Sequence, residues 1–186
     1  MQELKKDFKP TPITEKTPLS VVCVKYGTKY GPDYVNKLFR GVERNLSLPH
    51  RFYCMTEEGE GLEAGIEVLP LKHKWSGWWS KVHLFEGVFE GRVLYIDLDM
   101  VISGSLDELA GYQGPFATMS TNDIFCEMVQ DGYNSSVVLY ESGVAKVLFD
   151  TLEQHYNHLL KFLMRFDHYL EMLVWRADLV QQLCKD

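Results

Sequence analysis

The chain has little positive charge, few cysteines and no long apolar run. Its 186 residues include 19 Lys and Arg against 26 Asp and Glu, a formal net charge of −7. Proteins that bind nucleic-acid backbones without sequence specificity need a basic face, so this balance argues against nucleic acid as a partner. No apolar run approaches the roughly 20 residues that cross a bilayer, so we expect no membrane span.

The cysteines show no CxxC spacing, so neither a zinc site nor a disulfide framework is expected. Two of them, Cys23 and Cys54, lie in strand-like runs, where thiols commonly serve as small core residues. Residues 1–18 contain three prolines and lack the apolar segment of a signal peptide. We therefore expect a flexible N-terminal arm over 1–18, one domain over 19–186, and a cytoplasmic location.

What the sequence does contain is an alternation of strand-like and helix-like segments. Strands are expected at residues 20–26, 51–55, 66–71, 92–96, 116–120 and 136–140. Helices are expected at residues 32–45, from Ser80 to 89, briefly after Ser105, at 144–164 and, with a break, at 167–183. This alternation predicts an α/β protein, a single-domain α/β/α sandwich with a mainly parallel, mixed central sheet. Ligands of such sheets bind beyond the carboxyl ends of the strands.

The segment VLYIDLDMVI (residues 93–102) places two carboxylates, Asp97 and Asp99, between apolar runs. An unpaired charge in a buried strand costs several kcal/mol, so the pair requires a reason. Strand alternation directs both side chains to the same face. Two hard oxygen ligands close together suit a Mg²⁺ or Mn²⁺ ion that also binds phosphates. The segment therefore predicts a divalent-metal site at the end of a central strand.

Two other interpretations of this acidic pair remain open. Both acids could be solvated in a turn at a strand end. Residues 97–101 also fit the DxDx[TV] pattern of haloacid-dehalogenase-type phosphatases, where the first Asp is a nucleophile and the second an acid/base. In those enzymes the motif closes the first strand, whereas three expected strands precede it here, and no second acid pair follows a later strand.

A strand, the DxD sequence and the GSLD of residues 104–107 together resemble the nucleotide-sugar glycosyltransferases of the GT-A fold. The resemblance is greatest to family 8 and related bacterial and viral members. Residues 22–30 (VCVKYGTKY) resemble the first strand and nucleotide-binding loop, and residues 77–81 (GWWSK) the segment that carries a basic residue before DxD. Residues 133–138 (YNSSVV) resemble the stretch in which an Asn meets the sugar, and residues 165–168 (RFDH) more weakly resemble an Asp-Gln segment.

The resemblance implies sugar transfer from a nucleotide-diphosphate sugar, most readily a UDP-sugar, to a glycan or glycoconjugate acceptor. Asp97 and Asp99 would hold Mn²⁺ or Mg²⁺. The expected donor-binding residues are Tyr26, Gly27, Thr28, Tyr30, Lys81, Asp97, Asn134, Ser135 and Asp167. The polar segment 121–133 would face the sugar and the acceptor. The candidate catalytic residues, any of which would be a general base if the reaction inverts, are Asp123, Glu127 and Asp131.

Ordinary structural interpretations compete for several of these residues. Lys81 could be a solvated lysine at a helix start, Asn134 a local cap in a turn, and residues 27–31 a plain strand-to-helix loop. Among the clustered tryptophans, at least one is expected to anchor the core, although a lid over the donor is also consistent with the segment. These are Trp75, Trp78 and Trp79.

The sequence departs from family 8 at the metal site. Family members place a third ligand, a His in an HxxGxxKPW-like segment, after the last helix, and this sequence contains no such segment. His168 could substitute, although its spacing does not demand that role. A non-catalytic nucleotide-sugar-binding domain is therefore an alternative to a transferase.

Overall fold

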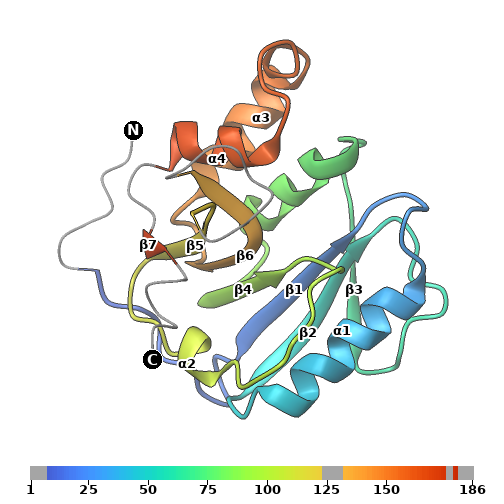
Figure 1. Ribbon diagram of the computed structural model, residues 1–186, viewed down its shortest axis with the longest axis vertical. Helices are drawn as coiled ribbons and strands as arrows, with labels where there is room; N and C mark the ends of the chain where they lie inside the picture. Colours follow the sequence, from blue (N-terminus) through green and yellow to red (C-terminus); the bar gives the residue numbers. More distant parts are fainter. Residues whose placement is uncertain (1–7, 123–131, 175–177, 180–186) are drawn as a thin grey trace.

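The computed structural model describes residues 8–122, 132–174 and 178–179. Within these ranges the centre is a seven-stranded sheet in the order β3-β2-β1-β4-β6-β5-β7 (Figure 1). β1 pairs in parallel with β2 and β4, β2 with β3, and β5 with β7, whereas β6 is antiparallel to β4 and β5. The expected mixed, mainly parallel sheet is confirmed. The strands are β1 (Leu19–Lys25), β2 (His50–Thr56), β3 (Ile66–Pro70), β4 (Arg92–Ile96), β5 (Phe116–Ser120), β6 (Tyr133–Glu141) and β7 (Asp178–Leu179).

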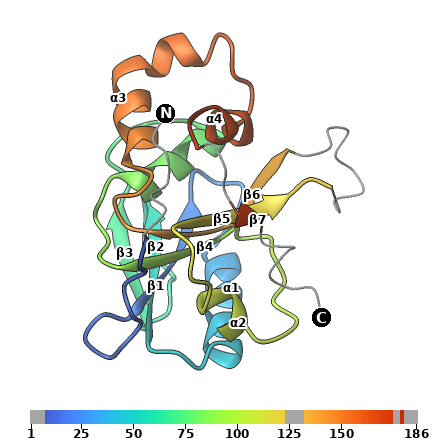
Figure 2. The ribbon, with the colours of Figure 1, turned by 90° about the vertical axis from the view of Figure 1, so that its left-hand side faces the viewer.

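Helices cover both faces of this sheet, which confirms the α/β/α sandwich (Figures 1 and 2). One face carries α1 (Pro32–Asn45) and α2 (Asp107–Ala110), and the other carries the 3₁₀ helix η1 (Gly77–Phe85), α3 (Lys146–Leu159) and α4 (Phe166–Leu173). Successive residues of β1 alternate between the two cores: Val22 packs with η1, α3 and α4, and Val21 with α1. Burial on both faces explains why this strand reads as a continuous apolar run.

The cysteines of the central strands are core residues, as the sequence predicts. Cys23 and Cys54 lie opposite each other in the β1–β2 register, and both are free thiols with no exposed surface. Burial is the main reason why the pKa of Cys23 lies well above its ordinary value. The pair therefore packs as small apolar groups and not as reactive thiols.

Three helical predictions differ from the structure. The helix expected from Ser80 is a 3₁₀ helix that begins at Gly77, with Ser76 at its N-cap position. The helix expected over 144–164 is shorter because its last residues turn through i→i−3 hydrogen bonds, such as that from Phe162 N–H to the Leu159 carbonyl at 3.0 Å. The region expected to be helical over 167–183 contains α4 and the short strand β7.

Residues near the amino terminus contact the domain. The Thr11 N–H donates to Glu141 Oε2 at 3.2 Å, its hydroxyl donates to the same carboxylate, and Ile13 packs against the core beneath α1. The flexibility expected of residues 1–18 stays a prediction. In the described ranges, no helix is long and apolar enough to cross a membrane.

Candidate functional site

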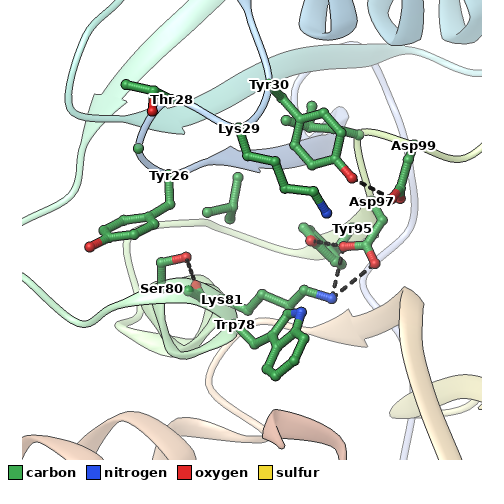
Figure 3. A pocket seen from close by; sticks show the side chains of 14 residues that line it. Tyr26, Thr28, Lys29, Tyr30, Trp78, Ser80, Lys81, Tyr95, Asp97 and Asp99 are labelled. Carbon is green, nitrogen blue, oxygen red and sulfur yellow. Dashed lines mark hydrogen bonds and ion pairs between the residues drawn. The ribbon is translucent and has the colours of Figure 1, made fainter.

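A pocket of about 350 Å³ lies at the carboxyl ends of β1 and β4 (Figure 3). The chain passes from β1 through α1 to β2, which lies on one side of β1 in the sheet, whereas β4 lies on the other side of β1. Such a reversal opens a crevice between adjacent parallel strands, the usual ligand site of this architecture. The pocket is lined by the loop at residues 26–30, by η1 and by the turn at residues 97–99.

The loop after β1 carries four of the expected donor-binding residues, which all line the pocket: Tyr26, Gly27, Thr28 and Tyr30. Gly27 has a φ of +62°, a conformation that side chains other than glycine rarely adopt, and its N–H donates to the Glu57 carboxylate at 3.2 and 3.3 Å. The sequence therefore fixes a tight turn at this point. It brings two tyrosine rings to the edge of the crevice.

Asp97 follows directly after β4 and is held by three groups. Its N–H donates to the Ser136 carbonyl at 2.8 Å, which continues the pairing with β6 beyond the strand. Its carboxylate accepts from Lys81 Nζ, at 2.8 Å to Oδ1 and 3.0 Å to Oδ2, and from the Tyr95 hydroxyl. Burial, with the Asp97 charge adding to it, holds the pKa of Tyr95 well above its ordinary value. Tyr95 therefore stays protonated and donates.

Asp99 is exposed and accepts a 2.6 Å hydrogen bond from the Tyr30 hydroxyl. That bond is the main reason why the pKa of Tyr30 is raised. Lys29 Nζ lies 4.7 Å from the centre of the Tyr30 ring, and its hydrogen bond to Tyr30 raises the Lys29 pKa. Although the strand ends before Asp97, both carboxylates line the pocket, while Leu98 between them packs into the core.

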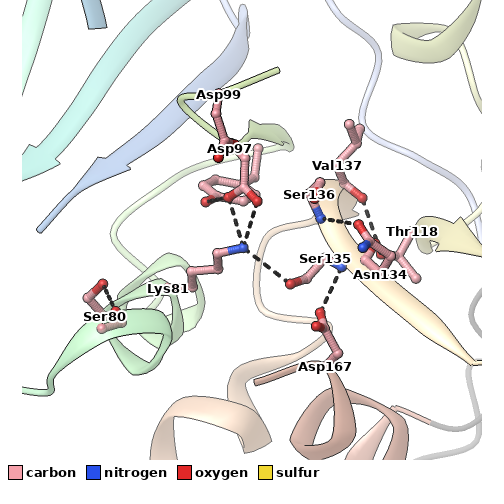
Figure 4. Close-up of polar contacts among 12 residues, drawn as sticks. Ser80, Lys81, Asp97, Asp99, Thr118, Asn134, Ser135, Ser136, Val137 and Asp167 are labelled. Atoms are coloured by element: carbon pink, nitrogen blue, oxygen red, sulfur yellow. Dashed lines mark hydrogen bonds and ion pairs between the residues drawn. The ribbon is translucent and has the colours of Figure 1, made fainter. Parts of the chain in front are cut away.

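The start of β6 and the start of α4 extend this network (Figure 4). Lys81 Nζ donates to Ser135 Oγ at 3.3 Å, and the Ser135 N–H donates to Asp167 Oδ1 at 2.8 Å. The side-chain oxygen of Asn134 accepts the Ser136 N–H at 3.0 Å, a local contact of the capping kind. Ser135 and Asp167 thus join the Lys81 network, while Asn134 lies beside it.

The three candidate catalytic residues, Asp123, Glu127 and Asp131, lie outside the described residues. Sequence reasoning missed Tyr95, which donates to Asp97 from two positions earlier on the same strand. Strand alternation was the available signal, since it directs both side chains to one face. Lys29 was also missed, although it lies inside the loop that was predicted to bind the nucleotide.

Asp97 and Asp99 would supply two of the oxygen ligands that a hard divalent cation requires. In residues 8–122, 132–174 and 178–179, no three or more His, Cys, Asp or Glu side chains are grouped so as to hold a metal, so His168 does not complete a set with Asp97 and Asp99. Mg²⁺ commonly binds through one or two carboxylates, with substrate phosphates and water as its other ligands. The two aspartates suit that kind of site, in which a cation would compete with Lys81 and Tyr30.

Comparisons with known proteins identify the fold. The sequence matches no protein family and no curated protein. Solved structures similar to this chain include the glycosyltransferase GlyE of Streptococcus pneumoniae TIGR4, with a TM-score of 0.68 and 17% identity over 90% of this chain and 46% of GlyE. The galactosyltransferase LgtC, in complex with donor and acceptor sugar analogues, gives a TM-score of 0.57 and 13% identity over 82% of this chain and 69% of LgtC.

The bifunctional glycosyltransferase WbbM gives a TM-score of 0.59 and 9% identity over 91% of this chain and 39% of WbbM. The protein therefore has the GT-A-type glycosyltransferase fold that the DxD segment led us to expect. At these identities the similarity defines the fold. The chain spans about half the length of GlyE.

Proposed function

We propose that this protein is a glycosyltransferase that takes a sugar from a nucleotide-diphosphate sugar, most readily a UDP-sugar. One observation carries the proposal: the glycine-containing loop after β1, Lys81 and the two DxD carboxylates meet in one pocket at the topological switch point. Each of these groups suits one part of the donor. The acceptor would be a glycan or glycoconjugate.

The tyrosines and the lysine would bind the donor. The rings of Tyr26 and Tyr30 offer faces on which a nucleobase can stack, and the Gly27 turn lets the backbone approach closely. The side chain of Lys81 is only 12% exposed, so its ammonium would act on a diphosphate with little screening by water. Asp97 and Ser135 hold its ammonium in place, which pre-organises that charge.

Asp97 and Asp99 would hold Mn²⁺ or Mg²⁺. When bound, such a cation acts as a Lewis acid that stabilises negative charge on a leaving phosphate. Lys81 would neutralise part of the same charge. Donor binding would draw the Lys81 ammonium from the Asp97 carboxylate toward the phosphates, which would leave that carboxylate free to serve as a ligand. Ser135, whose N–H is held by Asp167, would position the lysine during this exchange.

Asn134 and the segment 121–133 complete the proposal. The amide of Asn134 would meet the donor sugar. Asp123, Glu127 or Asp131 would serve as general base if the transfer inverts. A haloacid-dehalogenase-type phosphatase is not favoured, because the DxD segment follows β4 and not the first strand. A nucleotide-sugar-binding domain without transfer activity is the alternative, supported by the absence of a third grouped protein ligand among the residues that the structure describes.

A scan of donors tests this proposal. The thermal midpoint of the protein would be measured with UDP-, GDP- and other nucleotide sugars, each with and without Mn²⁺. We expect a donor-specific, Mn²⁺-dependent rise, because a ligand that binds only the native state stabilises it. Hydrolysis or transfer of that donor would then distinguish an enzyme from a binding domain. If no nucleotide sugar raises the midpoint and simple phosphate monoesters are cleaved, the proposal is wrong.

A further inference from the structure

Three tryptophans lie within five residues at the start of η1, and the structure gives them different environments. Trp75 and Trp79 are each 5% exposed. Trp75 stacks on His73 with ring centres 4.3 Å apart, and Trp79 packs edge-on against Tyr169 at 5.5 Å. These two confirm the expectation of a core anchor. Trp78 is 60% exposed and lines the pocket at the carboxyl ends of β1 and β4.

The backbone around Trp78 is fixed. Gly77 has a φ of +59°, which turns the chain sharply before Trp78. The Ser76 N–H donates to the Tyr156 hydroxyl at 3.0 Å, and Ser80 Oγ donates to the Gly77 carbonyl at 2.7 Å. With the buried Trp75 and Trp79 on either side, this turn anchors the backbone that carries Trp78. A large apolar ring is thus presented to solvent on an ordered support.

The place of Trp78 in the pocket indicates what it would contact. In Figure 3, Trp78 and Lys81, which both belong to η1, lie on the opposite side of the pocket from Lys29 and Tyr30. The proposed nucleotide site is the loop that carries Tyr30, and the proposed phosphate site is at Lys81. If the donor runs from the Tyr30 loop to Lys81, as proposed, the indole would lie at the sugar end of the donor, where the acceptor would meet it.

We infer that Trp78 is a stacking platform for the acceptor, and that the acceptor is a saccharide whose pyranose ring presents a face of C–H groups. This inference rests on the proposed glycosyltransferase function. An indole face carries partial negative charge and attracts polarised C–H groups, and stacking also buries apolar surface on both partners. The donor's charged parts are accounted for by Lys81 and the carboxylates. The open ring of Trp78 is left for the second substrate.

Two variants and one control test the platform. Trp78→Ala removes the ring, Trp78→Phe keeps a smaller one, and Phe162→Ala removes an aromatic side chain that is 72% exposed and does not line the pocket. The probes are UDP with Mn²⁺, measured by calorimetry, and the methyl β-glycosides of glucose, galactose and N-acetylglucosamine. Saturation-transfer NMR in the presence of UDP and Mn²⁺ would detect the glycosides.

We expect at least one glycoside to bind the wild type, with the strongest saturation on protons of one ring face. Trp78→Ala should weaken that binding by about tenfold or more, as expected for loss of an aromatic contact. Trp78→Phe should retain part of the signal, Phe162→Ala all of it, and all variants should bind UDP like the wild type.

Two outcomes would overturn the inference about Trp78 and leave the proposed function standing. One is a glycoside signal in Trp78→Ala equal to that of the wild type, and the other is no glycoside signal in a wild type that binds UDP. An equal loss of UDP affinity in Trp78→Ala would also overturn it, because Trp78 would then belong to the donor site. If the wild type fails to bind UDP itself, the proposed function fails with it.

Discussion

The ammonium group of Lys81 binds both carboxylate oxygens of Asp97, at 2.8 and 3.0 Å. The two residues are 12% and 20% exposed, so water screens the pair less than it would an ion pair at the surface. The same ammonium reaches Ser135 Oγ at 3.3 Å. The structure therefore positions the Lys81 ammonium beside the Asp97 carboxylate.

Replacing Lys81 tests whether its ammonium binds the donor diphosphate. Lys81→Ala should weaken donor binding by about 1–3 kcal/mol, the usual range for losing a hydrogen bond between charged groups. The loss should be similar for different sugars on one nucleotide, because the diphosphate is common to all of them. Calorimetry with two UDP-sugars and UDP makes the comparison, with Lys37→Ala, in an exposed i,i+4 pair with Asp33, as the control. A loss of affinity confined to one sugar would show that Lys81 contacts the sugar and not the diphosphate.

The Tyr30 hydroxyl donates to Asp99 at 2.6 Å and would compete with the proposed cation for that carboxylate. Tyr30→Phe keeps the ring and removes this competitor. We therefore expect Mn²⁺ alone to bind the variant more tightly by roughly 0.5–1.5 kcal/mol, the net worth of a typical hydrogen bond. Electron paramagnetic resonance of free Mn²⁺ measures this change. Tyr34→Phe is the control, since its ring packs 4.8 Å from that of Tyr30. Weaker Mn²⁺ binding by Tyr30→Phe would show that the hydroxyl assists the metal site.

Asn134 can be tested by separating its acceptor from its donors. Its side-chain oxygen accepts the Ser136 N–H at 3.0 Å, and Asp at this position keeps that acceptor while losing the NH₂ group. If Asn134 binds the sugar, Asn134→Asp should weaken UDP-sugar binding more than UDP binding, with thermal stability largely retained. Asn134→Ala should in addition lower stability. Equal losses for both ligands would show that Asn134 supports the fold or the nucleotide.

Acid should destabilise the element that carries Lys81. His83 has no exposed surface, its Nε2 accepts the His73 N–H at 3.0 Å, and its Nδ1 donates to the Ser80 carbonyl at 2.9 Å. This arrangement requires a neutral ring, and burial lowers the pKa of His83 below its ordinary value of 6.5.

The unfolded chain therefore takes up this proton first, as the pH falls through about 6.5, and the free energy of unfolding decreases toward the lower folded-state pKa. Urea unfolding at pH 7.5 and 5.5 should show a smaller loss for His83→Gln, which cannot titrate, than for the wild type. An equal decrease in the free energy of unfolding in both proteins would show that groups other than His83 cause the acid sensitivity.

The sequence was sufficient to predict the sandwich, because apolar runs mark strands buried on both faces, and to place Asp97 and Asp99 directly after the fourth strand, where they line the pocket. It could not predict the partners of these carboxylates. The Tyr30–Asp99 bond joins residues far apart in the chain, and it forms only because β1 and β4 are neighbours in the sheet. The 3₁₀ start at Gly77 was also missed, since a left-handed glycine followed by tryptophans has no helical periodicity.

The central claim is that Asp97 and Asp99 hold a cation that binds a nucleotide-sugar donor in this pocket. Calorimetric titration of UDP and a responding UDP-sugar, with and without Mn²⁺, into the wild type, Asp99→Asn and Asp97→Asn tests it most directly. Asp99→Asn is the cleaner variant, because Asp97→Asn also leaves the largely buried Lys81 without its counter-charge. We expect Mn²⁺-dependent donor binding in the wild type and its loss in both variants, with the native fold retained in Asp99→Asn. Unchanged donor affinity in both variants, or donor binding by the wild type that is indifferent to Mn²⁺, would contradict the account.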